Sequence, residues 1–273
     1  MFELADKTWF LLAVIVYGLC TIYLVFLWRH GFRQNDRISY SLLCLAFLFH
    51  TLAMVRRGLS FNRCPLSNLY EAITFAGWAL VLAYLIVGAL PRLRFLGAFA
   101  SPVLLCMGVF ALFPDLDTHG PQRELVRGWS SFHAALILLA YGAFGLGSVA
   151  GLMYLSQEHD LKFRKLRAVL ALMPPIDRLE RVIGRLLTAG LLLLTVGLVL
   201  GGLTLHRKGP QYTLWDAKVI WSAIVWLVYL TLLVLRWRGT QVGRRFAWGA
   251  VGSFAFVLLT FWGTNLLSAI HQN

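Results

Sequence analysis

The chain has 273 residues, of which 59% are hydrophobic and only 14% are charged, whereas soluble domains are nearer a quarter charged. Its apolar runs are long enough to cross a hydrocarbon core of about 30 Å, which takes roughly 20 helical residues, so the sequence excludes a large soluble domain. The net charge of +13 fits basic loops on one side of a membrane and does not indicate a nucleic-acid partner.

Eight apolar segments predict an all-α polytopic membrane protein of about eight transmembrane helices, which form a single domain over residues 1–273. Trp and Tyr at several segment ends are typical of the membrane interface. Pro91 and Pro114 stand at segment ends, as expected of a residue that interrupts helical hydrogen bonding. In chain order, the predicted spans are about 9–28, 38–55, 72–90, 95–113, 131–155, 183–205, 219–235 and 246–267.

The basic residues predict the orientation of these spans. One set of loops, completed by Arg185 at the start of the sixth span, carries 16 Lys and Arg, whereas the loops and termini of the other side carry 9. Cytoplasmic loops collect Lys and Arg, so the first set is expected in the cytoplasm and both termini are expected outside. The basic set comprises the loops 29–37, 91–94, 156–182 and 236–245.

Three histidines fall near the expected outer face. His50 lies about six residues below the outer end of its span, roughly 9 Å of helix, His133 lies a few residues into its span, and His271 follows the last span. An ionisable residue within a span is a functional candidate, and two imidazoles can bind one heme iron from opposite sides. The shared depth predicts a heme site. Plainer interpretations stay open: a hydrogen bond between helices for His50, and a polar tail residue for His271.

Other polar and aromatic residues fall at the same face. The cation of Arg57, outside against the positive-inside trend, can pair with heme propionates, another anion or lipid phosphates. Trp215 offers a flat apolar face to a porphyrin and Asp216 can orient a donor, although an interfacial Trp before a helix-starting Asp is the simpler interpretation. Ser67 is expected to cap the next helix, with Glu71 in its first turn.

Four segments carry a family pattern. They are Pro65-Leu66-Ser67-Asn68-Leu69-Tyr70-Glu71 with Arg57 upstream, Ser131-Phe132-His133 through Ala140-Tyr141-Gly142-Ala143, Trp215-Asp216-Ala217-Lys218 followed by Trp221 and Trp226-Leu227-Val228-Tyr229, and Gly263-Thr264-Asn265-Leu266-Leu267-Ser268-Ala269-Ile270-His271. Together and in this order they resemble the CcsA/CcmC/ResC group of cytochrome c assembly membrane proteins, including its HemX-like branch. The first segment looks like the family's P-L-S-N-L-Y-E block and is the most specific match.

The resemblance implies that His133 and His271 are the axial ligands of a heme b iron and that the loop with Trp215 and Asp216 lies against the heme. It also implies a function in cytochrome c biogenesis at a bacterial-type cytoplasmic membrane. There, the protein would hold heme at the outer face and pass it to apocytochrome c. Another assembly membrane protein would act with it as a partner. The sequence offers no obvious acid–base pair or nucleophile, so we expect a heme chaperone and not a stand-alone enzyme.

The chain departs from the family signature W-G-x-x-W-x-W-D-P-K-E. Aligned without gaps, Gly209 and Thr213 replace the first two tryptophans, Ala217 replaces the proline, and Val234 stands where a membrane-embedded histidine is expected. An inner heme site of the family type is therefore not expected, unless it uses another ligand such as His50. Two alternatives stay open: a HemX-like regulator of heme or tetrapyrrole synthesis, and a non-heme transporter or structural subunit, although no transporter-type inverted repeat is evident.

Overall fold

The computed structural model describes residues 3–30, 36–60, 68–117, 129–163, 175–208 and 217–267 of the chain. This part of the chain is helical throughout, apart from short turns. The α-helices are α1 (Glu3–His30), α2 (Asp36–Ser60), α3 (Leu69–Gly88), α4 (Gly97–Ala111), α5 (Trp129–Phe163), α7 (Ile176–Lys208), α8 (Ala217–Trp237) and α9 (Arg244–Leu267), with the short 3₁₀ helices η1 (Pro91–Leu96) and η2 (Pro114–Leu116) on either side of α4.

Seven of the described helices, all except α9, are long and apolar enough to cross a membrane. This confirms the predicted all-α polytopic fold. In α5 the apolar span covers 132–159 against a prediction of 131–155, whereas the span in α7 begins seven residues earlier than predicted, at Ile176. The predicted span 246–267 corresponds to α9, which has 24 residues and packs along α5. The orientation in the membrane and the extent of the single domain stay predictions.

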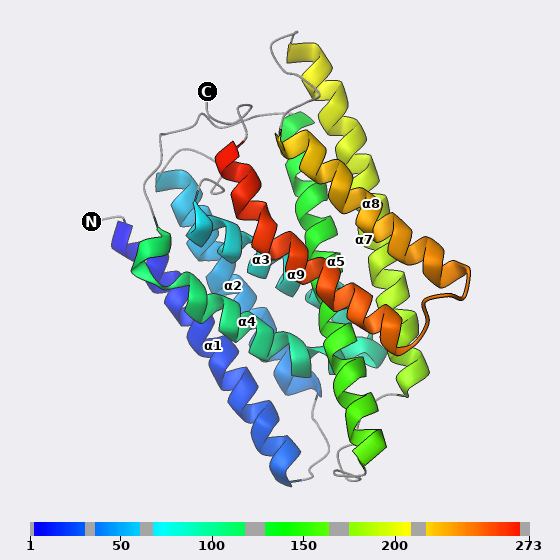
Figure 1. Cartoon of the computed structure of the whole chain (residues 1–273). Helices are drawn as coiled ribbons and strands as arrows, with labels where there is room; N and C mark the ends of the chain where they lie inside the picture. Colours follow the sequence, from blue (N-terminus) through cyan, green and yellow to red (C-terminus); the bar gives the residue numbers. More distant parts are fainter. Residues whose placement is uncertain are drawn as a thin grey trace.

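Successive helices run in opposite directions, so the bundle has two distinct ends (Figure 1). Helices α1, α3, α5 and α8 begin at one end, which we call the His133 end. Helices α2, α4, α7 and α9 begin at the other, which we call the Arg236 end. Helices α1 to α4 pack on one another, and α5, α7, α8 and α9 form a second group. Helix α5 joins the two groups because it contacts α3 as well as α7 and α9.

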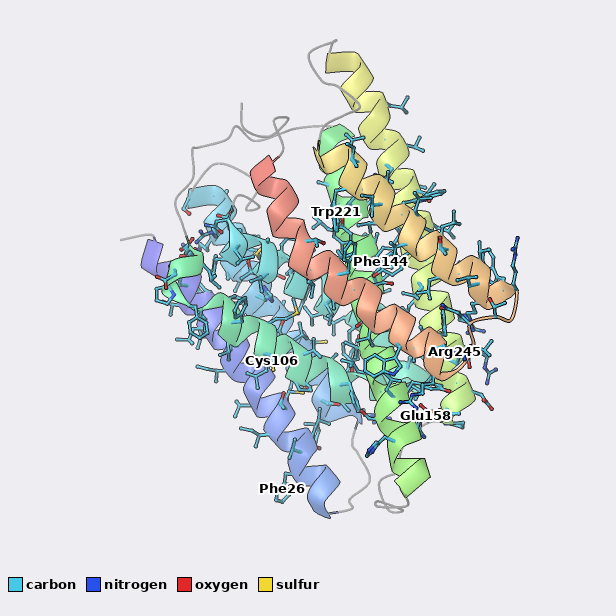
Figure 2. The ribbon with its side chains drawn as sticks, in the orientation of Figure 1. Phe26, Cys106, Phe144, Glu158, Trp221 and Arg245 are labelled. Carbon is cyan, nitrogen blue, oxygen red and sulfur yellow. The ribbon has the colours of Figure 1, made fainter. Side chains whose placement is uncertain are left out.

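Two helices extend beyond their predicted bounds at the Arg236 end. The sequence predicted a loop over 156–182. The predicted loop was too long, because α5 continues to Phe163 and α7 already begins at Ile176. Charged side chains end an apolar run without ending the backbone hydrogen bonding of a helix. One such pair, Arg244 and Glu158, forms an ion pair of 3.6 Å, and Figure 2 places Glu158 at this end of the bundle.

Helices α3 and α5 approach so closely at Gly142 that backbone meets backbone. A Cβ atom on Gly142 would lie 2.3 Å from the carbonyl oxygen of Ala79. In a membrane, helices associate through van der Waals packing, and small residues allow this close approach. The contact at Gly142 therefore positions α5 and its side chains against the first helix group.

The variant Gly142→Ala tests this close approach. The added methyl group should force α3 and α5 apart and lower the free energy of unfolding by about 1–3 kcal/mol, the usual cost of overpacking. Gly252→Ala in α9 is the matched control, since nothing lies within 4 Å of its would-be Cβ atom. Thermal unfolding in detergent compares the two variants, and equal melting temperatures would contradict the contact.

Candidate functional site

His133 lies near the start of α5, and its side chain is fixed against the neighbouring helix α7. Its Nδ1 atom is 2.6 Å from the backbone carbonyl oxygen of Gly197. A carbonyl oxygen only accepts hydrogen bonds, so Nδ1 must carry the proton and donate it. In a neutral imidazole the other nitrogen, Nε2, then keeps its lone pair. Among the described residues none is hydrogen-bonded to Nε2, which leaves this atom available as a ligand.

Gly201, one turn further along α7, provides the space for the His133 ring. A Cβ atom on Gly201 would lie 2.5 Å from Cε1 and 2.7 Å from Nδ1 of the imidazole. Atoms that are not bonded do not approach so closely, so a side chain at this position would displace the ring. Gly197 and Gly201 are four residues apart and lie on one face of α7. Together they hold the imidazole ring against the α7 backbone.

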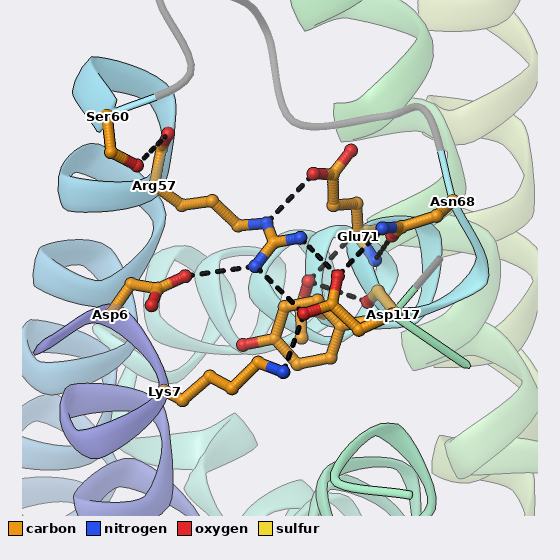
Figure 3. A network of polar contacts seen from close by, with 9 residues as sticks. Asp6, Lys7, Arg57, Ser60, Asn68, Glu71 and Asp117 are labelled. Carbon is orange, nitrogen blue, oxygen red and sulfur yellow. Dashed lines mark hydrogen bonds and ion pairs between the residues drawn. The ribbon is translucent and has the colours of Figure 1, made fainter. Parts of the chain in front are cut away.

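Arg57 lies at the centre of a buried ion-pair network at the same end of the bundle (Figure 3). Its guanidinium group donates from Nε to Glu71 at 2.8 Å, from Nη1 to Asp6 at 3.0 Å, and from Nη2 to Asp117. The three carboxylates come from α3, α1 and the segment after η2. The network thus ties two helices, α1 and α3, and the segment after η2 to the end of α2.

These contacts give Arg57 partners that the sequence did not suggest. The sequence pointed to heme propionates or lipid phosphates, whereas the side chain is 4% exposed and is paired with carboxylates of the protein itself. Its guanidinium also lies over the ring of Tyr70, at 4.6 Å from the centroid. A buried charge is costly unless it is paired, and this pairing explains an arginine at this depth without any external anion.

Asp117 completes the network from outside the membrane spans. It pairs with Lys7 at 2.6 Å and accepts a hydrogen bond from Nδ2 of Asn68 at 2.8 Å. Burial would raise the pKa of the Asp117 carboxyl, but the hydrogen bonds and charges of Lys7 and Arg57 outweigh burial and hold this pKa below its ordinary value. The carboxylate therefore stays ionised to lower pH than a free aspartate, and its contribution to folding is lost only as the pH falls through the lowered pKa.

Asn68 also caps helix α3. Its Oδ1 atom accepts a hydrogen bond of 2.8 Å from the backbone N–H of Glu71, which satisfies one of the unpaired donors of the first turn. The sequence predicted Ser67 as the cap, which was wrong by one residue, because α3 begins at Leu69 and Asn68 is its cap. Glu71 lies in the first turn, as predicted.

His50 is enclosed within the first helix group and is only 2% exposed. The hydroxyl group of Tyr17 lies 3.1 Å from its Nδ1 atom, and the ring of Phe10 meets it edge-on, with centroids 5.0 Å apart. The cavity beside it, which Thr74 and Gly77 also line, measures about 10 Å³, enough for one water molecule and too small for a porphyrin. The contact with Tyr17 is a hydrogen bond between helices, the plainer interpretation that the sequence left open.

The residues that follow the predicted Trp–Asp segment form α8, and two of its aromatic side chains, Trp221 and Tyr229, pack against other helices of the second group. Tyr229 stacks on Phe144 of α5 with centroids 3.6 Å apart, and Trp221 contacts Phe256 of α9 at 5.0 Å. Figure 2 shows Phe144 and Trp221 among α5, α8 and α9. These contacts anchor α8 directly after the predicted Trp–Asp segment.

Three predicted site residues, Trp215, Asp216 and His271, lie outside the described residues, so their predicted roles beside a heme stay predictions. Within the described ranges, no group of three or more His, Cys, Asp and Glu is arranged to hold a metal ion. A heme site of the predicted kind needs only two histidines.

The residues that position His133 and Arg57 could not be predicted from the local sequence. Gly197 and Gly201 carry no chemistry of their own, and their only signal was the spacing of four residues in α7. Nothing in the local sequence pattern links Asp6 and Asp117 to Arg57, because they are 51 and 60 residues away from it in the chain.

The chain matches a protein-family model described as "Cytochrome C assembly protein" over residues 66–271. It belongs to the cytochrome c assembly protein family. The "Cytochrome c biogenesis protein CcsA" of Prochlorococcus marinus strain MIT 9313 is 29% identical over 269 residues, which cover 88% of this chain and 85% of the relative. The protein of the same description from strain NATL2A is 30% identical over 270 residues, with the same coverage.

A more distant relative, the "Cytochrome c biogenesis protein CcsA" of Guillardia theta, is 26% identical over 249 residues, which cover 84% of this chain and 83% of the relative. These matches confirm the family that the four sequence segments predicted. They also make this chain a membrane protein of cytochrome c biogenesis.

Loss of the Arg57 guanidinium should destabilise the protein strongly. In Arg57→Gln, the buried carboxylates of Asp6 and Glu71 lose their cation, which typically costs about 3–5 kcal/mol. Arg56→Gln is the matched control, because Arg56 is the neighbouring residue of α2 and is exposed, and exposed substitutions usually stay within about 0.5 kcal/mol. Thermal unfolding in detergent separates the two, and a melting temperature of Arg57→Gln equal to that of the control would contradict the network.

Proposed function

We propose that this protein carries heme b as a cargo in cytochrome c biogenesis, with Nε2 of His133 as one axial ligand of the iron. The hydrogen bond from Nδ1 to the carbonyl oxygen of Gly197 carries the proposal. A histidine that binds a metal usually donates its other ring N–H to a carboxylate, a backbone carbonyl or water, which fixes its tautomer and raises the basicity of the ligating nitrogen. His133 has this arrangement.

His271 is proposed as the second axial ligand, with Trp215 and Asp216 beside the porphyrin. Ligation by two histidines fills both axial positions of the iron while the edge of the porphyrin stays exposed to an acceptor. The proposed acceptor is apocytochrome c, on the outer side of a bacterial-type cytoplasmic membrane. Another assembly membrane protein is the proposed partner, and any heme-attachment activity would be shared with it, so the chain acts as a chaperone and not as an enzyme by itself.

Two of the residues first considered for heme are left out of this proposal. Arg57 is proposed to stabilise the His133 end of the bundle through its carboxylate network. His50 is proposed to stabilise the packing of α1, α2 and α3, because the cavity beside it is too small for a porphyrin. The proposal therefore predicts one heme per chain.

The proposal is tested by the absorption spectrum of protein purified from heme-replete cells. The wild type should show the spectrum of a low-spin, bis-histidine heme, and His133→Ala should lose it. Gly201→Ala should weaken heme binding roughly 10- to 100-fold, the usual effect of disturbing a group that orients a metal ligand, because its methyl group would displace the His133 ring.

Gly202→Ala is the matched control, because nothing lies within 4 Å of the would-be Cβ atom on the adjacent glycine, and it should bind heme like the wild type. A wild-type protein that is colourless and takes up no added heme would overturn the proposal. So would a Gly201→Ala variant with unchanged affinity, or a His133→Ala variant that keeps the bis-histidine spectrum.

The altered tryptophan signature, with Gly209 and Thr213 in place of two tryptophans, favours a second candidate function, that of a regulator of heme synthesis. Cells that produce only His133→Ala distinguish the two. If the protein is a heme carrier, this variant should abolish the covalent attachment of heme to c-type cytochromes. If it is a regulator, the variant should change the level of heme precursors while c-type cytochromes stay intact.

A further inference from the structure

A pocket of about 480 Å³ lies at the Arg236 end of the bundle, where α7 begins and α8 ends. Three arginines line it, Arg181 and Arg185 from α7 and Arg236 from α8, together with small and apolar residues that include Gly184 and Leu192. The pocket is at the other end of the bundle from His133 and shares no residue with the proposed heme site.

Arg236 is held in place by residues of two other helices. A Cβ atom on Gly184 of α7 would coincide with its guanidinium group, at 1.1 Å from Nη1, so the glycine leaves the space that the guanidinium fills. The guanidinium carbon also lies 4.6 Å from the ring centroid of Phe246 in α9. The position of Arg236 is therefore fixed by the packing of the bundle.

Among the described residues, the three arginines of the pocket have no ion-pair partner, although Glu180 is close enough to act on Arg236 through its charge. Arg181 donates from Nε to the backbone carbonyl of Asp177 at 3.2 Å. This pocket therefore contrasts with the network around Arg57, where three carboxylates compensate one arginine, and it attracts an anion from outside the chain.

The depth of the arginines indicates where that anion comes from. Arg185 directly precedes a run without charged residues, 186–205, and Arg236 directly follows another, 219–235. A run of about 20 helical residues matches the hydrocarbon thickness, so both arginines stand at the edge of the hydrocarbon core. This is the level of the lipid phosphate groups.

An exposed apolar row on α7 continues from the pocket along the hydrocarbon core. The row begins at Leu192, seven residues after Arg185, and continues at steps of four, three and four residues. Each of its residues is more than half exposed. Residues at this spacing share one helix face. The row consists of Leu192, Val196, Val199 and Leu203. A molecule with a negative head at the arginines would have a surface for an acyl chain directly above it.

We propose that this pocket binds the headgroup of an anionic phospholipid, with its phosphate at Arg181, Arg185 and Arg236 and one acyl chain along the exposed row of α7. Basic pockets between transmembrane helices are suited to such headgroups. The bound lipid would bridge α7 and α8, because its phosphate contacts arginines from both helices.

The binding of dioctanoyl phosphatidylglycerol to purified protein in detergent, followed by thermal shift, tests the proposal. Each arginine near a lipid surface contributes about a five-fold gain in affinity, so Arg185→Gln should weaken binding about five-fold and Arg181→Gln/Arg185→Gln about 25-fold. Both arginines are exposed, so these variants should fold normally. Arg178→Gln is the matched control, since Arg178 is exposed on the same helix but does not line the pocket, and it should bind like the wild type.

Two comparison ligands distinguish the sources of the anion. Dioctanoyl phosphatidylcholine, which has the same chains and no net charge, should bind at least five-fold more weakly than phosphatidylglycerol, and inorganic phosphate should give no comparable shift. Equal binding of the two lipids, equal stabilisation by phosphate alone, or equal affinity in Arg185→Gln and Arg178→Gln would each overturn the proposal. Loss of heme uptake in Arg185→Gln with unchanged lipid binding would also overturn it and would indicate a heme propionate site instead.

Discussion

The close packing of α5 against its neighbours is the constraint on which the rest of the structure depends. In a bilayer no hydrophobic force drives helices together, because lipid is as apolar as the side chains, so shape must supply the contacts. Glycines provide that shape along the whole contact between α5 and α7. A Cβ atom on Gly190 would lie 2.5 Å from the Phe144 ring, and one on Gly197 would lie 3.0 Å from Ile137.

The same glycine-lined contact positions the candidate ligand. At Gly201, the last glycine of this contact, the space that a side chain would fill is occupied by the imidazole ring of His133. The carbonyl group of Gly197 fixes the tautomer of this ring. Packing and ligand geometry therefore share one structural element, and a change in the distance between α5 and α7 would alter both. The proposed ligation of heme by His133 would therefore depend on helix packing as much as on the histidine itself.

The arginines at the two ends of the bundle have opposite surroundings. At the His133 end, Arg57 is surrounded by Asp6, Glu71 and Asp117 and acts as a structural cation. At the Arg236 end, the arginines of the pocket have no carboxylate partner among the described residues. Charge alone does not distinguish these roles, because both sets of arginines stand beside apolar runs in the sequence.

The sequence predicted the helices well because a span needs only length and hydropathy, which are local properties. It predicted the family from the block that ends at Tyr70 and Glu71 and from the segments around the histidines. It did not predict the partners of Arg57, since ion pairs over 51 and 60 residues depend on tertiary packing. Depth alone also grouped His50 with His133, whereas the structure encloses His50 among Phe10 and Tyr17.

The tautomer of His133 is the most direct test of this account. Solid-state NMR of protein labelled with ¹⁵N-histidine, in bilayers and without heme, reports which ring nitrogen carries the proton, and the His133 signals are those missing from His133→Gln. The hydrogen bond to Gly197 predicts a protonated Nδ1 and an unprotonated Nε2. An unprotonated Nδ1 would contradict the account, because the lone pair for iron would then face the Gly197 carbonyl.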